Sequence, residues 1–94
     1  MRLIGIHVLA DFKSTHSDAA SQIDTWVAEV KNAEWQTPHE LKRRYPSASI
    51  PVSGNVVFNF KGNRYRLHVL ISYQNQIITV VRFGTHDQYM RWIY

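Results

Sequence analysis

Apolar positions in the first half of the chain follow strand-like runs and then helical spacing. The run from Arg2 to Val8 predicts a short strand, although periodicity alone does not separate it from a turn of buried helix. Leu9 to His16 predicts a short helix. Ser17 or Asp18 can cap a longer helix, in which four apolar side chains recur at i, i+3, i+4 and i+7: Ile23, Trp26, Val27 and Val30. We expect this stripe to pack in the core and to have no role in chemistry.

A third helix is expected to begin at Thr37. Thr37 can cap the helix, Pro38 suits its first position, and Glu40 completes a capping box. This helix must be short, because Pro46 blocks its continuation. The residues that follow, Ser47 to Gly54, are typical of a loop.

The second half of the chain predicts a β-meander. Strands are expected at Val56 to Phe60, Arg64 to Ser72 and Ile77 to Phe83, with Gly84 ending the last one. The first turn is Lys61-Gly62-Asn63, in which Gly62 or Asn63 can take a positive φ.

The middle strand alternates cleanly between apolar and polar side chains. One face carries Tyr65, Leu67, Val69 and Ile71, which we expect to meet the helices. The other face would direct Arg64, Arg66, His68 and Leu70 toward solvent. Beyond the meander, Thr85 and Gln88 form a second capping box, opening a final helix that contains Tyr89, Met90, Trp92 and Ile93 and in which the chain ends.

These elements predict a single α+β domain over residues 1–94, with N-terminal helices packed on a mostly antiparallel sheet and a C-terminal helix. Cysteine is absent, which favours a reducing compartment and excludes thiol catalysis and cysteine-ligated zinc. The apolar start of the chain is interrupted by His7 and is too polar for a signal peptide or a membrane span. We therefore expect a cytoplasmic protein with no membrane partner.

Charge is distributed unevenly along the chain, which has a net charge of +4. From Leu41 to Tyr94 the only carboxylate is Asp87, whereas the same stretch carries Lys42, Arg43, Arg44, Lys61, Arg64, Arg66, Arg82 and Arg91. A positive surface favours an anionic partner such as nucleic acid. The same stretch lacks the carboxylates with which a two-metal nuclease binds Mg²⁺, so any cleavage of phosphodiesters there would need no metal.

Candidate phosphate-binding residues lie on and beside the middle strand. Arg64 and Arg66 are two positions apart, so they are expected to leave the sheet in one direction about 7 Å apart and to suit neighbouring phosphates. Lys61, His68 and Arg82 would extend this surface. The alternative for each arginine is an ion pair with an acid from the N-terminal half.

His86 is the leading candidate for proton transfer. It is expected in the first turn of the last helix, where free N–H groups and the helix dipole attract a phosphate and favour neutral imidazole. The alternative is an ordinary surface histidine at a helix start. The other histidines, His7, His16, His39 and His68, show no metal-ligand spacing, so we predict neither a metal site nor a cofactor.

Motifs spread over roughly residues 20 to 90 occur in one order and at one spacing: Thr37-Pro38, Leu41 to Ala48, Val56 to Asn59, Lys61 to Leu67 and Arg82 to Tyr89. Together they resemble the HigB family of toxins from bacterial type II toxin–antitoxin pairs. The sheet motif combined with Gly84-Thr85-His86-x-x-Tyr89 carries the resemblance.

The resemblance implies a RelE/ParE-like fold with helices on a curved antiparallel sheet. It also implies an mRNA endonuclease that in many members acts on the ribosome, inhibits translation and is silenced by a helix-turn-helix, HigA-like antitoxin. By motif, the catalytic residues fall on Arg66, His86 and Tyr89, with Lys61 supplying charge from the turn. His86 stands where RelE itself often has arginine, which leaves the assignment of acid and base open.

The residue inventory suits RNA cleavage by the 2′-OH. The cations for the phosphoryl charge are Lys61, Arg64, Arg66 and Arg82. Apart from His68, His86 and Tyr89 are the only plausible groups near them for proton transfer. Two alternatives remain: a ParE-like toxin that binds gyrase without catalysis, and a non-catalytic RNA- or protein-binding module. Translation arrest with cut mRNA, as opposed to an SOS response, separates the nuclease from the gyrase-binding toxin.

Overall fold

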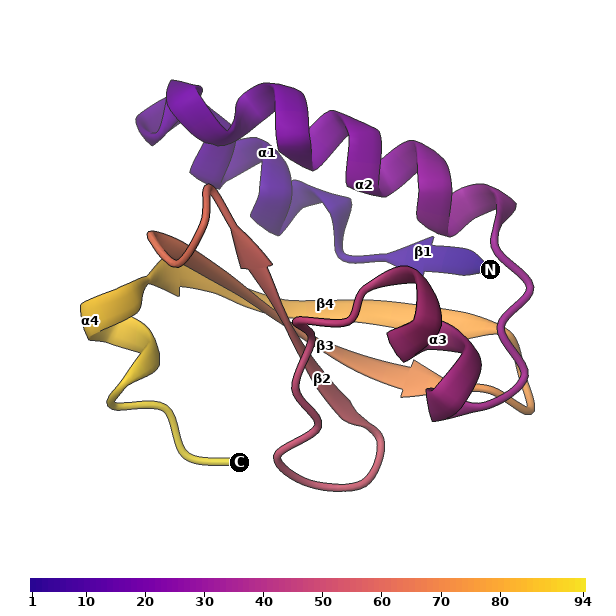
Figure 1. Cartoon of the computed structure of the whole chain (residues 1–94). Coiled ribbons are helices and arrows are strands. Elements are labelled where there is room, and N and C mark those ends of the chain that lie inside the picture. The colour runs from indigo at the N-terminus through magenta and orange to yellow at the C-terminus, as the bar shows by residue number, and fades with distance from the viewer.

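The computed structural model describes all residues from 1 to 94 as helices, strands and short connections (Figure 1). In chain order the elements are β1 (Arg2–Ile4), α1 (Ile6–Thr15), a 3₁₀ turn (Ser17–Ala19), α2 (Ala20–Asn32), α3 (Pro38–Arg44), β2 (Asn55–Phe60), β3 (Tyr65–Ser72), β4 (Ile77–Thr85) and α4 (His86–Tyr89). The predicted α+β class is confirmed.

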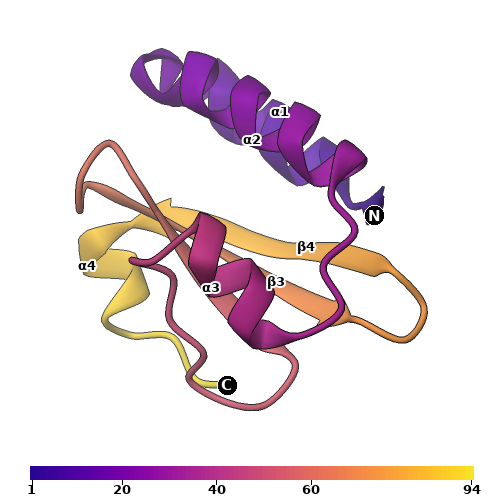
Figure 2. The same ribbon diagram turned by 45° about the vertical axis from the view of Figure 1, so that its right-hand side comes forward.

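The four strands form one mixed sheet in the order β1-β4-β3-β2. β2, β3 and β4 make the predicted antiparallel meander, and β1 adds to β4 in parallel. Helices α1 and α2 lie together over one face of this sheet (Figures 1 and 2). α4 and the end of the chain lie on the opposite side, so both faces are at least partly covered.

The core fills the space between the sheet and the helix layer. The predicted stripe of α2 is confirmed, since Ile23, Trp26 and Val30 are buried and Val27 packs against them. The core-facing residues of β3 also lie where the alternation placed them: Tyr65, Leu67, Val69 and Ile71 are all buried. Strand alternation and helical spacing therefore located the same core independently.

The predicted strand at the start of the chain is too long. Ile6 to Val8 belong to α1, because Gly5 adopts a φ of +90° and turns the chain directly from β1 into the helix. Gly5 also lies close to β4, where an added Cβ would be 2.8 Å from the carbonyl oxygen of Val80. A short apolar run fits a strand and a buried helix equally well, so periodicity alone does not find this boundary.

The predicted caps of α2 and α3 have different outcomes. At α3 the Thr37 hydroxyl accepts a hydrogen bond from the Glu40 backbone N–H at 3.2 Å, as expected. The predicted capping box is not completed, because the Glu40 carboxylate accepts from the backbone N–H of Gln36 at 2.8 Å and not from that of Thr37. At α2 the prediction is wrong, because Ser17 and Asp18 form the 3₁₀ turn and no side chain caps the helix. The carboxylate of Asp18 instead accepts hydrogen bonds from the strand side, where the Tyr65 hydroxyl donates at 2.9 Å.

The end of the chain also differs from its prediction. The capping box of Thr85 and Gln88 is present, but β4 continues through Gly84 to Thr85 and α4 ends at Tyr89. A helix extending to Ile93 is therefore wrong. The bonds tighten to i→i−3 at Arg91 and Trp92, and the Trp92 ring packs on Gly84, where an added Cβ would lie 2.9 Å from the ring. In the turn between β2 and β3, Lys61 and Gly62 take positive φ, whereas Asn63 does not.

None of the helices combines the length and the apolar character needed to cross a bilayer.

The tight approach of Gly5 to β4 makes a testable prediction. Gly5→Ala should lower the free energy of unfolding by about 2 kcal/mol or more, because it combines left-handed backbone strain with a contact against a carbonyl oxygen that cannot move away. Gly62→Ala is the matched control: its φ is +67°, but nothing lies within 4 Å of the added Cβ. It should cost only about 1 kcal/mol. Equal losses in urea unfolding would contradict a role for the Val80 contact.

Candidate functional site

Three polar side chains project from the centre of the sheet on the face opposite α1 and α2. Arg66 and His68 come from β3, and Arg82 comes from the register position opposite His68 on β4. We call these three residues the cationic face. The prediction that Arg66 and His68 point into solvent is wrong, because they are only 8% and 4% exposed. The C-terminal segment, residues 86–94, folds back over them.

Arg66 is a buried cation without a carboxylate partner. Its Nη1 donates to the carbonyl oxygen of Asn63 at 2.7 Å and lies 3.5 Å from that of Tyr65. The guanidinium carbon is 4.9 Å from the centre of the Tyr89 ring. These contacts leave the positive charge un-neutralised, and they use a single nitrogen of a group that has five N–H donors. The other donors of Arg66, on Nε and Nη2, form no hydrogen bond within the protein.

Tyr89, the last residue of α4, lies over the guanidinium of Arg66, and His86, the first residue of α4, lies next to Tyr89. Their rings are 6.1 Å apart, and the imidazole of His86 is exposed. The backbone N–H of His86 donates to the carbonyl oxygen of Arg64 at 3.0 Å, which ties α4 to the start of β3. The three residues predicted to be catalytic thus lie together. α4 has only four residues, however, so the expected effect of a helix dipole on His86 has little basis.

Arg82 and His68 form a second cluster beside Arg66. Arg82 Nε donates to His68 Nδ1 at 3.1 Å, and its Nη2 donates to the carbonyl oxygen of Ile93 at 3.0 Å. The guanidinium carbon lies 4.5 Å from the centre of the Trp92 ring and 5.6 Å from that of Tyr94. Arg82 therefore holds the end of the chain against the sheet.

The hydrogen bonds of His68 define its tautomer. Because arginine can only donate, Nδ1 must accept, so Nε2 carries the proton and donates to Asn55 Oδ1 at 2.8 Å. Burial, followed by the charge of Arg82, lowers the pKa of His68 below its ordinary value. His68 is consequently a neutral, fixed ring in this structure.

Arg64 and Lys61 lie outside the cationic face. Arg64 is an exposed residue of the turn before β3, and its Nη1 pairs with Asp18 Oδ2 at 3.1 Å on the helix side. The prediction that it leaves the sheet in the same direction as Arg66 is therefore wrong, and the ion-pair alternative holds for Arg64. Hydrogen bonds from Tyr65 and then Arg64 lower the pKa of Asp18. Lys61 is exposed and its ammonium group forms no ion pair.

Sequence reasoning missed the residues that hold the cationic face in place. Trp92 and Tyr94 were expected to belong to a helix or to the chain end, yet they pack on Arg82 and His68. The available signal was the density of aromatic residues within the last six positions of a chain whose sheet carries unpaired arginines. Asn55 and Asn63 had no such signal. No three histidine or acidic side chains come together as potential ligands of one metal ion.

Comparison with known proteins identifies one family. No curated protein matches the chain. The sequence model of the HigB toxin family, described as a RelE-like toxic component of a toxin-antitoxin system, matches residues 19–92. This match spans α2, α3, the antiparallel strands β2, β3 and β4, α4 and every residue of the cationic face, but not β1 or α1. The chain therefore belongs to the HigB toxin family, the RelE-like toxic components of toxin–antitoxin systems.

Proposed function

We propose that this toxin is an endoribonuclease that cleaves mRNA without a metal ion, at the site formed by Arg66, His86 and Tyr89. The observation that carries the proposal is the buried, un-neutralised guanidinium of Arg66 beneath Tyr89, whose ring lies 6.1 Å from the exposed imidazole of His86. This arrangement puts a receptor for a phosphate next to groups that can move a proton.

The proposed reaction uses the RNA's own 2′-OH. Its oxygen attacks the adjacent phosphorus while the bond from phosphorus to the 5′-oxygen breaks, leaving a 2′,3′-cyclic phosphate and a 5′-OH. One group takes the proton from the 2′-OH and another protonates the leaving 5′-oxygen. His86 and Tyr89 carry out these transfers, and the free donors of Arg66 stabilise the charge that develops on the phosphoryl oxygens. Which residue is the acid and which is the base stays open.

The surrounding cations would guide and hold the RNA backbone. Lys61 is exposed and unpaired, and the ion pair of Arg64 with Asp18 is exposed, so a phosphate can replace the carboxylate at little cost. Arg82 contributes its positive charge from beneath Trp92. His68 acts on RNA through Arg82, because its own ring nitrogens are both occupied.

Family membership supports the remaining parts of the proposal. A toxic component of a toxin–antitoxin system implies an antitoxin, which we propose to be a helix-turn-helix, HigA-like protein. We further propose that the mRNA is cut on the ribosome in the cytoplasm, so that translation stops. A non-catalytic gyrase-binding toxin would have no need of the arrangement of Arg66, His86 and Tyr89.

The central prediction concerns Arg66 and His86. His86→Ala removes a proton-transfer group, and Arg66→Lys keeps the charge but loses the fork of donors, so each should lower RNA cleavage by about 10²–10⁴-fold. His39→Ala, at an exposed position of α3, is the matched control and should cleave normally. The measurement is cleavage of mRNA followed by primer extension, with circular dichroism to establish that each variant is folded.

One additive and one modified substrate sharpen this test. Cleavage should survive EDTA and should spare an RNA with a single 2′-deoxy nucleotide at the scissile position. Full activity of folded His86→Ala would remove His86 from the mechanism, and metal dependence would overturn the scheme. Undiminished toxicity of His86→Ala together with an SOS response would favour the gyrase-binding alternative.

Substitutions of Tyr89 test how much the ring over Arg66 contributes to the rate of RNA cleavage. Tyr89→Ala uncovers the guanidinium and removes the hydroxyl, so the cleavage rate should fall by about 10²-fold or more. Tyr89→Phe keeps the ring: near-normal cleavage would assign its role to stacking, and a loss as large as that of Tyr89→Ala would assign it to proton transfer. Normal cleavage by Tyr89→Ala would exclude Tyr89 from the site.

The neutral ring of His68 predicts a pH dependence of stability. Its pKa is lower in the folded chain than the ordinary value of 6.5, so the unfolded chain takes up the proton first. Stability contributed by His68 is therefore complete above about pH 7 and falls as the pH drops below about 6.5 toward the folded pKa. His68→Gln should lose less stability than the wild type between about pH 7 and 5 in urea titrations. His39→Gln, at an exposed site, should follow the wild type; parallel curves for all three proteins would contradict the assignment.

A further inference from the structure

A groove runs along the outer side of α2, on elements that do not contribute to the cationic face. Two adjoining hollows of about 510 and 340 Å³ share Glu29 and Arg44. One wall is α2 from Gln22 to Ala33, and the other is the chain around Trp35 and from Arg44 to Ser47, with β2 at the base of the smaller hollow. We call this hollow the α2 groove. No residue of the cationic face lines it.

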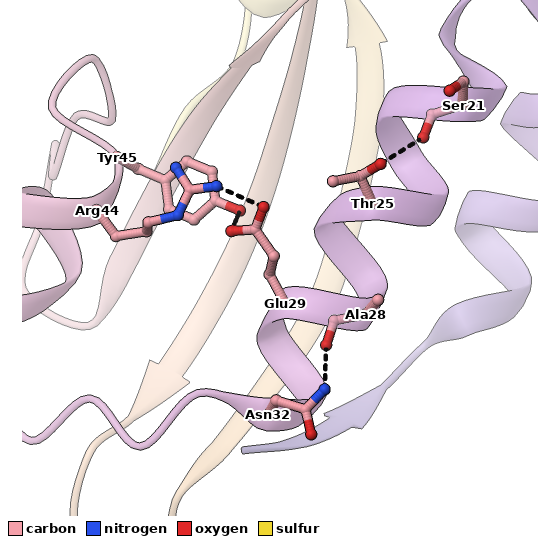
Figure 3. Close-up of polar contacts among 7 residues, drawn as sticks. All are labelled: Ser21, Thr25, Ala28, Glu29, Asn32, Arg44 and Tyr45. Carbon is pink, nitrogen blue, oxygen red and sulfur yellow. Dashed lines mark hydrogen bonds and ion pairs between the residues drawn. The ribbon is translucent and has the colours of Figure 1, made fainter.

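A polar contact at the centre holds the α2 groove open. The carboxylate of Glu29 accepts hydrogen bonds from the guanidinium of Arg44 and from the Tyr45 hydroxyl, the latter at 2.7 Å (Figure 3). This contact joins α2 to the end of α3, so the two walls are fixed before any partner arrives. Burial, followed by the bond to Glu29, raises the pKa of Tyr45, so the hydroxyl stays a donor.

The α2 groove contains backbone and side-chain groups that a protein partner can satisfy. β2 is an edge strand, and Val57 directs its N–H and carbonyl outward to Ser49. Asn59, two residues further on, directs its own backbone groups to the same outer edge, where it lines the smaller hollow. Trp26 lines that hollow too, and its buried indole N–H has no acceptor. An extended peptide supplies both the backbone partner and the acceptor.

The charge of α3, whose last residue Arg44 lines both hollows, favours one kind of segment. Lys42 and Arg43 are exposed in the last turn of α3 beside Arg44, and neither forms an ion pair. An acidic segment is therefore favoured. The carboxylate of Glu29 and the aromatic side chains of Trp26, Phe58 and Phe60 make the interior unsuited to an RNA backbone but suited to an apolar side chain.

We propose that the α2 groove binds an extended, acidic segment of the antitoxin, which inserts an apolar side chain beside Trp26. Membership of a toxin–antitoxin family implies that such a partner protein exists. The α2 groove and the cationic face share no residue, so the antitoxin docks without competing with RNA for the same side chains.

The test uses three substitutions on the exposed side of α2, each of which introduces one arginine. Thr25→Arg and Ala28→Arg place a long side chain in the smaller and the larger hollow. Ser21→Arg is the matched control, one turn away from Thr25 and outside both hollows. The Thr25 hydroxyl bonds only to the Ser21 carbonyl within its own helix, so neither change removes a tertiary contact (Figure 3). The full chain is titrated calorimetrically with the purified protein encoded by the neighbouring gene.

The α2 groove predicts that Thr25→Arg and Ala28→Arg weaken this binding by about tenfold or more, whereas Ser21→Arg binds like the wild type. Arg43→Glu should also weaken it and reduce its salt dependence, whereas Lys31→Glu, on the other side of α2, should not. RNA cleavage should be unchanged in all five variants.

Unchanged affinity in both groove variants would overturn the proposal. If Thr25→Arg and Ala28→Arg lose RNA or ribosome binding but keep antitoxin binding, the proposal is also overturned, since the groove would then serve RNA. Binding is measured without RNA. A wild-type chain that fails to cut RNA would thus contradict the nuclease activity, while the titration would still decide on the groove.

Discussion

The return of the C-terminal segment onto the sheet is the contact on which the cationic face depends. Gly84 leaves room for the ring of Trp92, and Arg82 then holds the segment through the carbonyl oxygen of Ile93. This packing removes Arg66 from water and brings Tyr89 over its guanidinium. A charge shielded from water interacts more strongly with an arriving anion, because the local dielectric constant is lower. The last residues of the chain thus cover a cation without neutralising its charge.

The uneven charge along the chain becomes an uneven charge in space. Acids of the N-terminal half pair with arginines outside the strands, Asp18 with Arg64 of the turn between β2 and β3 and Glu29 with Arg44 of α3. The arginines in the middle of the sheet, Arg66 and Arg82, receive only carbonyl oxygens, a ring nitrogen and aromatic faces. The ion pair of Asp18 therefore joins the helical layer to the turn before β3, the ion pair of Glu29 joins α2 to α3, and the guanidinium groups of Arg66 and Arg82 have no carboxylate partner. One chain of 94 residues in this way presents the cationic face and a separate groove.

Sequence patterns predicted the parts of this protein that depend on periodicity and local hydrogen bonds. The α2 stripe, the alternation of β3 and the caps at Thr37 and Thr85 each need only neighbours along the chain. The failures lie where a distant contact decides the local structure. Asp18 accepts a hydrogen bond from Tyr65 instead of capping α2, and α4 ends where the ring of Trp92 packs on Gly84. The motif around His86 located the candidate site, but the burial of Arg66 and His68 followed from packing that alternation alone does not encode.

The central claim is that Arg66, His86 and Tyr89 cleave RNA by activating its 2′-OH. The most direct measurement is the mass of the fragments that the purified toxin releases from a short synthetic RNA, or from mRNA in a translating ribosome if free RNA is not cut. Attack by the 2′-OH predicts upstream fragments ending in a 2′,3′-cyclic phosphate and downstream fragments starting with a 5′-OH. Fragments starting with a 5′-phosphate would mean that water is the nucleophile and would contradict this account. An absence of cleavage in both substrates would contradict it as well.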